Sequence, residues 1–166
     1  MFKKRRPNYA KGALAGVAGG LVASFAMNQF QAVLAKTIPH RQNGSQHAGD
    51  EPATVKIADA VSRRVFDHEL APKEKASAGN AVHYAFGAAA GALYGVLAEA
   101  KAASRFGFGT LFGSALWFLA DEVAVPRLGL SGPASDYPAS THASSWASHL
   151  VYGVTTDLVR RGLRAI

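Results

Sequence analysis

The chain has 166 residues, of which 49% are hydrophobic and 17% are charged, and its formal net charge is +7. The charged share is low beside the roughly 25% of soluble domains, and the length suits one domain covering residues 1–166. The sequence has no cysteine, which excludes disulfides, zinc thiolate sites and thiol catalysis. Its basic residues flank apolar runs, a pattern typical of membrane segments that argues against nucleic acid as a partner.

The first apolar run covers residues 12–35 and follows a basic N-terminal stretch. This pattern also fits a signal peptide. Small or amide side chains recur at every fourth position, which puts them on one helix face and lets another backbone come close. These residues are Gly12, Gly16, Gly20, Ser24 and Asn28. A discarded signal needs no such ridge, so we favour a retained membrane-spanning helix.

A polar section, residues 36–78, separates the first apolar run from the second. Asp50 and Pro52 offer an N-cap and a first-turn proline, and apolar residues then follow at helical spacing until Pro72. This pattern predicts a short amphipathic helix within residues 51–71. We expect it to lie on the membrane surface or to cap a helix bundle.

The second apolar run, residues 79–100, has the clearest pattern of a membrane-spanning helix. As a helix it extends about 33 Å, enough to cross a hydrocarbon core of about 30 Å. A second ridge of small residues recurs every fourth position: Gly87, Gly91 and Gly95. His83 and Glu99 lie on the same row, at its two ends. We therefore expect this helix to pack closely through its glycine face.

Two further apolar runs complete the chain. One covers residues 106–125 and is closed by Pro126, and the other covers residues 142–160. The last is rich in serine, threonine and histidine, so it crosses a membrane only if its polar face is buried. The sequence thus predicts an all-α integral membrane bundle of four transmembrane helices, or of three if the last does not span. We expect a multi-pass protein of the bacterial inner membrane. Its basic flanking residues predict that both termini lie in the cytoplasm.

Alternating crossings place five polar side chains near the outer membrane surface. Helical rise puts His83 about 6 Å and His149 about 10 Å below it, and Asn28, Asp121 and Glu122 fall near that level. These side chains either hold the helices together by hydrogen bonds or bind or relay a proton, a metal ion or a small polar solute. The spacing matches no known metal-ligand motif, which leaves any metal unknown. Axial haem ligation by two histidines is a further alternative, but no cofactor is expected.

An inner polar layer is predicted at the opposite membrane surface. Glu99 and Asp157 lie close to basic flanking residues there. We expect ion pairs with those residues or contact with water, not chemistry.

A short sequence repeat occurs in two of the predicted helices. Residues 83–87 and 149–153 both read His-x-x-x-Gly, in helices that run in the same direction. A duplicated helical hairpin explains this match, and so does chance.

The C-terminal half resembles the YagU-like family of small bacterial inner-membrane proteins. The residues that carry the resemblance are His83, Tyr94, Ala98, Glu99, Trp117, Glu122, Pro126, Gly129, His149, Arg160 and Arg161. Asp121 stands where the family has a second histidine, so the resemblance does not carry a multi-histidine site onto this chain. The resemblance implies an integral membrane protein of an uncharacterised family, loosely associated with acid tolerance and without enzyme activity.

No catalytic signature is present in the sequence: it has no GxSxG, phosphate loop, dinucleotide fingerprint or HExxH motif. We therefore expect a protein that is not an enzyme and whose main partner is the lipid bilayer. The leading hypothesis is that the outer polar layer responds to external pH or handles a proton or small ion. The competing hypothesis is a structural or accessory subunit that packs through its glycine ridges into a homo-oligomer or a larger membrane complex.

Overall fold

The computed structural model describes residues 7–37, 51–100 and 107–165. Within these ranges every regular element is helical, which confirms the all-α fold class. The long helices are α1 (Tyr9–Thr37), α3 (Pro72–Ala100) and α6 (Ala139–Ala165). The shorter elements are α2 (Ala53–Phe66), α4 (Thr110–Trp117), the π-helix η3 (Phe118–Ala124), α5 (Val125–Arg127) and the 3₁₀-helix η4 (Ala134–Asp136).

Three described segments are long and apolar enough to cross a membrane: Tyr9–Thr37, Pro72–Ala100 and Gly107–Arg127. They correspond to α1, α3 and the continuous run from α4 through η3 to α5. Three candidate membrane spans therefore support the prediction of a helical, membrane-associated protein. α6 has 27 residues but is not among them, so a fourth crossing stays a prediction.

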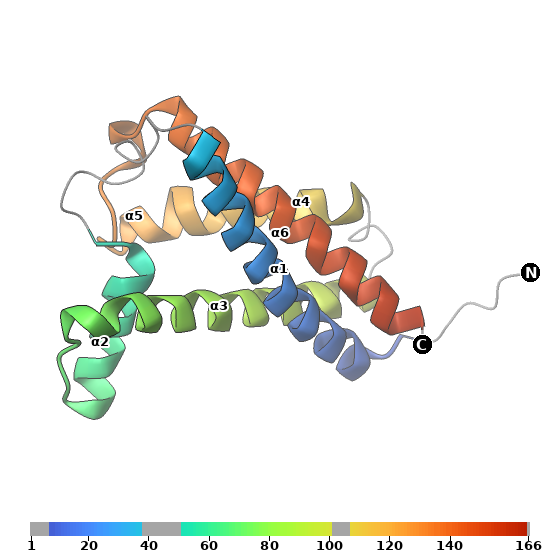
Figure 1. Cartoon of the computed structure of the whole chain (residues 1–166). Helices are drawn as coiled ribbons and strands as arrows, with labels where there is room; N and C mark the ends of the chain where they lie inside the picture. The colour runs from blue at the N-terminus through green and yellow to red at the C-terminus, as the bar shows by residue number, and fades with distance from the viewer. Residues whose placement is uncertain (1–6, 38–50, 101–106, 166) are drawn as a thin grey trace, which may run out of the picture.

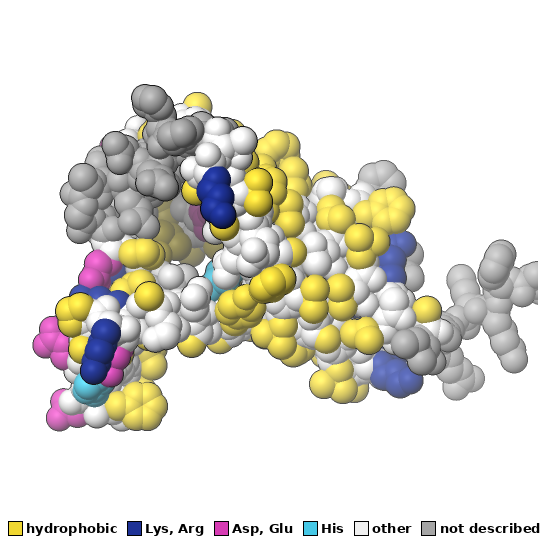
Figure 2. Space-filling view, in the orientation of Figure 1, with side chains coloured by type: hydrophobic (Ala, Val, Ile, Leu, Met, Phe, Trp, Pro, Cys, Tyr) yellow, Lys and Arg dark blue, Asp and Glu magenta, His cyan; other side chains and the backbone are white. Residues whose placement is uncertain are grey.

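The helices run alternately in opposite directions. Figure 1 shows α1 and α6 side by side, crossing α3 and the α4–α5 segment. The start of α1 and the ends of α3 and α6 lie together at one end of the bundle, which we call the Arg164 end. α2, the start of α3 and α5 lie at the other, which we call the α2 end. Figure 2 shows apolar side chains over the middle of the molecule and charged ones toward both ends, as expected for a protein in a bilayer.

α1 packs on α3 at backbone distance through glycine. A Cβ added to Gly12 would lie 2.7 Å from the carbonyl oxygen of Gly95, and similar collisions would follow further along the two helices. The facing pairs are Gly12 with Gly95, Gly16 with Gly91, and Gly20 with Gly87. The two glycine ridges recognised in the sequence thus face each other within one chain.

α4 packs on α6 in a second glycine interface, which the sequence analysis did not identify. A Cβ on Gly153 would lie 3.0 Å from both the Cα and the nitrogen of Gly113 and would collide with the carbonyl oxygen of Gly109. Gly91 stands in the same relation to the carbonyl oxygen of Gly16 and the backbone of Gly20. The two helix pairs are therefore built alike.

Local signals explain where the helices begin. The Asn8 side chain accepts the backbone N–H of Lys11 at 2.9 Å, which caps α1. α3 begins at Pro72, seven residues before the predicted membrane segment, because proline suits the first helical position. Glu74 then accepts the backbone N–H of Ala71 at 2.8 Å, which satisfies one donor at this end.

The sequence predicted that the third helical run stops at Pro126, and this is wrong. The run continues through α5 to Arg127, and Gly129, just beyond the C-cap, has a φ of 68°. The N–H of Leu130 bonds to the carbonyl of Val125 at 3.0 Å, and that of Gly129 bonds to Pro126 at 3.0 Å. This is a Schellman motif, in which glycine takes the left-handed position.

Candidate functional site

The candidate site lies at the α2 end, where η3 faces α6. η3 is a π-helix of seven residues that carries the adjacent carboxylates Asp121 and Glu122. Pro126 has no N–H to donate to the carbonyl of Glu122, and a wider helical turn accommodates this lost bond. π-helical turns recur at functional sites. Here the turn presents both carboxylates to side chains of α6.

Glu122 pairs with His142, in the first turn of α6. The distance from Glu122 Oε1 to His142 Nδ1 is 2.6 Å, and His142 Nε2 lies 3.1 Å from the carbonyl oxygen of Ala134. A carbonyl oxygen only accepts, so Nε2 carries a hydrogen. The other ring nitrogen, Nδ1, faces the Glu122 carboxylate at hydrogen-bond distance. The pair thus joins an imidazole and a carboxylate, the two side-chain types most often used to exchange protons.

Asp121 joins a second cluster on the neighbouring turns of α6. The Ser145 hydroxyl donates to Asp121 Oδ2, and His149 Nδ1 lies 3.8 Å from the same oxygen. His149 is 7% exposed, and its Nδ1 donates to the backbone carbonyl of Ser145 at 3.0 Å. The carboxylate of Asp121 is thus held by one hydroxyl and faces one buried imidazole.

His83 brings α3 into this cluster. Its ring interacts with the backbone of Ser24 in α1 and lies within electrostatic range of His149 and Asp121. Its Nε2 is buried and makes no hydrogen bond within the described ranges. The Ser24 hydroxyl and the Trp117 indole N–H are likewise buried and without a partner there. These three groups therefore have hydrogen-bonding capacity that the described residues do not use.

The predicted outer layer is brought together in part. Asp121 and His149 face each other at 3.8 Å with His83 within electrostatic range of both, and Glu122 forms a separate pair with His142. Asn28 is half-buried in α1 and hydrogen-bonds to none of the other described side chains. No three His, Asp or Glu side chains among the described residues are arranged to hold a metal ion.

His142 is the site residue that the sequence analysis missed. It begins the fourth apolar run, and a histidine at a segment boundary is usually solvated. Its depth in the membrane could have identified it. α6 starts at the depth where the third helical run ends, so His142 and Glu122 lie in the same layer. Helical directions, not sequence spacing, carry that information.

The predicted inner layer forms a network of ion pairs at the Arg164 end. Arg164 donates to Glu99 at 2.8 and 3.0 Å, and Arg160 Nη1 lies 3.9 Å from the same carboxylate. Asp157 is fully buried and accepts from Arg160 at 3.0 Å and from Arg161 at 2.6 Å. Both carboxylates are thus held by arginines of α6, as buried charges must be.

A scan against protein families matches residues 55–158 to a family described as "Protein of unknown function (DUF1440)". The chain belongs to this family. The DUF1440 match runs from α2 into α6 and includes His83, Asp121, Glu122, His142 and His149. α1 and Arg164 lie outside it. Neither a search of curated proteins nor one of solved structures found a match.

Proposed function

We propose that the protein is a small, non-enzymatic, multi-pass protein of the bacterial inner membrane that takes up and passes protons at its α2 end. The observation that carries this proposal is the Glu122–His142 pair, in which a carboxylate oxygen lies 2.6 Å from an imidazole nitrogen and the other ring nitrogen lies 3.1 Å from the carbonyl oxygen of Ala134. The buried cluster of His83, Asp121 and His149 provides a second group that can accept a proton. The role requires no cofactor.

The proposed topology has four crossings with both termini in the cytoplasm. α6 forms the fourth crossing, because several of the polar side chains that would oppose its insertion are covered by other helices. Ser148, Thr156 and Asp157 are almost fully buried, and α6 packs against both α1 and α4. The α2 end then faces the periplasm, where α2 lies at the membrane surface and both histidine sites meet external acid.

The resemblance to the YagU-like family adds a physiological expectation. That family is loosely associated with acid tolerance, and histidine changes its charge near pH 6.5. We therefore propose that proton handling at the α2 end supports survival at low pH.

Proton movement through liposomes that contain the purified protein tests this proposal. Vesicles loaded with a pH-sensitive dye are exposed to an acid pulse, and the decay of the pH gradient is followed. We expect the wild-type protein to speed the decay and Glu122→Gln or His142→Gln to return it to the rate of empty vesicles. His68→Gln is the matched control, because His68 forms an exposed pair with Glu74 at 3.2 Å outside the site. Wild-type vesicles that decay no faster than empty ones would refute proton handling.

A second candidate function is supported by the outward face of the third helical run. Leu111, Phe118 and Leu119 are each more than half exposed there, whereas other residues of α4 pack on α6 and Phe112 contacts Tyr94 of α3. Such a surface fits lipid or the helix of a partner subunit. The mass of the particle solubilised in mild detergent distinguishes them. If the particle is heavier than one chain, and if the Leu119→Asn substitution lowers its mass, the accessory-subunit function would be favoured.

A further inference from the structure

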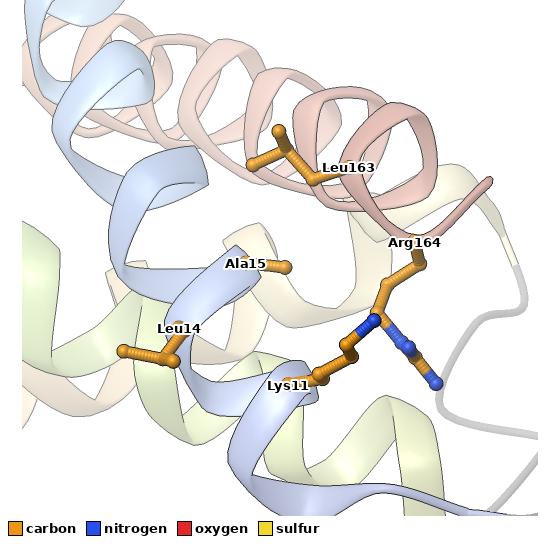
Figure 3. A pocket seen from close by; sticks show the side chains of 5 residues that line it. All are labelled: Lys11, Leu14, Ala15, Leu163 and Arg164. Atoms are coloured by element: carbon orange, nitrogen blue, oxygen red, sulfur yellow. The ribbon is translucent and has the colours of Figure 1, made fainter. Parts of the chain in front are cut away.

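A pocket of about 240 Å³ opens at the Arg164 end, between the start of α1 and the end of α6. Its lining residues are Lys11, Leu14, Ala15, Leu163 and Arg164. Figure 3 shows the side chains of Lys11 and Arg164 extending toward each other from the two helices. The pocket is distant from the histidine sites, which lie at the opposite end of the bundle.

The charge around this pocket is unbalanced. Glu99 and Asp157 are the described carboxylates here, and both are already engaged by arginines of α6. Lys11 adds a further cation and forms no ion pair with another described residue. None of the described residues that line the pocket carries a carboxylate. Arg164 is already paired with Glu99, but the described cations at this end outnumber the described carboxylates, so an anion in the pocket would be attracted to both Lys11 and Arg164.

Apolar side chains lie beside the two cations. Leu14 is 71% exposed and lies one turn further along α1, a segment able to cross a membrane. Leu163 is 46% exposed and precedes Arg164 on α6. A ligand that satisfies this surface carries a negative head and an apolar tail.

We propose that this pocket binds an anionic phospholipid. Its phosphate lies between the Lys11 ammonium and the Arg164 guanidinium, and an acyl chain covers Leu14 and Leu163. The neighbouring membrane provides such a lipid at high local concentration, and basic residues at a membrane surface attract it. Binding would link the first helix to the last at the end where they meet.

Thermal unfolding of the detergent-purified, full-length protein tests this inference. Dioctanoyl phosphatidylglycerol is the probe, and dioctanoyl phosphatidylcholine is the zwitterionic comparison. We expect the anionic lipid to raise the unfolding midpoint and the zwitterionic lipid to leave it unchanged. Lys11→Gln should reduce the shift to less than half. Lys36→Gln is the matched control, because Lys36 lies at the other end of α1, and it should keep the full shift.

Three outcomes would overturn the proposal. One is the absence of a shift when phosphatidylglycerol is added to the wild-type protein, and another is an equal shift in Lys11→Gln and Lys36→Gln. Glycerol 3-phosphate, which lacks acyl chains, tests the source of the phosphate. A shift as large as that given by the lipid would assign the pocket to a soluble phosphate compound instead. Lys11 is exposed, so its substitution leaves the helix interfaces intact and keeps the comparison valid.

Discussion

Glu99 and Arg164 are 65 residues apart in the chain and are joined by two hydrogen bonds, of 2.8 and 3.0 Å. The same carboxylate accepts the backbone N–H of Asn8 at 3.0 Å. Asn8 caps α1, Glu99 lies near the end of α3, and Arg164 lies near the end of α6. One carboxylate therefore ties three helices together at one end of the bundle.

Replacement of Glu99 by Gln should destabilise the protein by about 2 kcal/mol, because hydrogen bonds to charged groups contribute about 1.5–3 kcal/mol each. The loss also leaves Arg160 and Arg164 without their shared carboxylate. Chemical or thermal unfolding in detergent measures the change. Glu69→Gln is the control, since Glu69 pairs with Arg63 in an exposed position where an ion pair contributes little. Equal effects of the two substitutions would contradict the importance of Glu99.

Replacement of Gly91 by Leu should separate α1 from α3. The new side chain would meet the backbone of Gly16 and Gly20, and overpacking of this kind costs about 1–3 kcal/mol or more. The yield of monodisperse protein on size-exclusion chromatography measures the outcome. Gly162→Leu is the matched control on α6, since no atom lies within 4 Å of a Cβ added there. If both variants behave as the wild type, the α1–α3 interface is not packed as described.

Ser145→Ala should weaken the contact between η3 and α6. The Ser145 hydroxyl donates to Asp121, whereas that of Ser144 bonds to backbone carbonyls of its own helix. Loss of a hydrogen bond to a charged group predicts a destabilisation of about 1.5–3 kcal/mol for Ser145→Ala and a smaller one for Ser144→Ala. Unfolding midpoints of the two variants, measured side by side, decide this. A larger loss for Ser144→Ala would refute the assignment.

The turn between α2 and α3 should be sensitive to acid. The backbone N–H of Leu70 donates to Asp59 at 3.1 Å and lowers the pKa of this carboxyl, and Arg63 contributes at 2.8 Å. A carboxyl whose pKa is lower in the folded state stabilises the fold above its unfolded value, near pH 3.9. That stability is lost as the pH falls through the lower, folded value.

Hydrogen exchange of the Leu70 amide measures this effect. At neutral pH we expect stronger protection in the wild type than in Asp59→Asn, because a neutral amide oxygen accepts a weaker hydrogen bond than a carboxylate. Below the folded pKa the two proteins should exchange alike. The amide of Gly12 bonds to the backbone carbonyl of Asn8 at 2.8 Å and provides the internal control. Protection of Leu70 that is the same in both proteins at neutral pH would disprove the role of Asp59.

Helical periodicity explains what the sequence predicted well. A row of residues at every fourth position depends only on the helix repeat, so Gly12 to Gly20 and Gly87 to Gly95 were recognisable as packing faces without a structure. The helix against which each glycine row packs was not recognisable from the sequence. A glycine ridge packs equally well on another helix of the same chain or on a second molecule, and only tertiary contacts pair Gly16 with Gly91.

The candidate site shows the limit of sequence periodicity. His83, Asp121 and His149 were placed at one depth by counting residues from the membrane surface. The pairing of Glu122 with His142 depends on the π-helical turn of η3, in which each residue turns less than in an α-helix. Backbone hydrogen bonding around Pro126 governs that turn, and side-chain spacing does not reveal it.

The two glycine interfaces divide the protein into two helix pairs. Residues up to 100 contain both members of the α1–α3 pair, and residues from 107 contain both members of the α4–α6 pair. The halves meet chiefly where α1 lies on α6, with Gly19 against the backbone of Thr156. We therefore expect each half to keep its own helix pairing when it is translated separately. Two co-expressed fragments, divided between residues 100 and 107, should reassemble in the membrane as one protein.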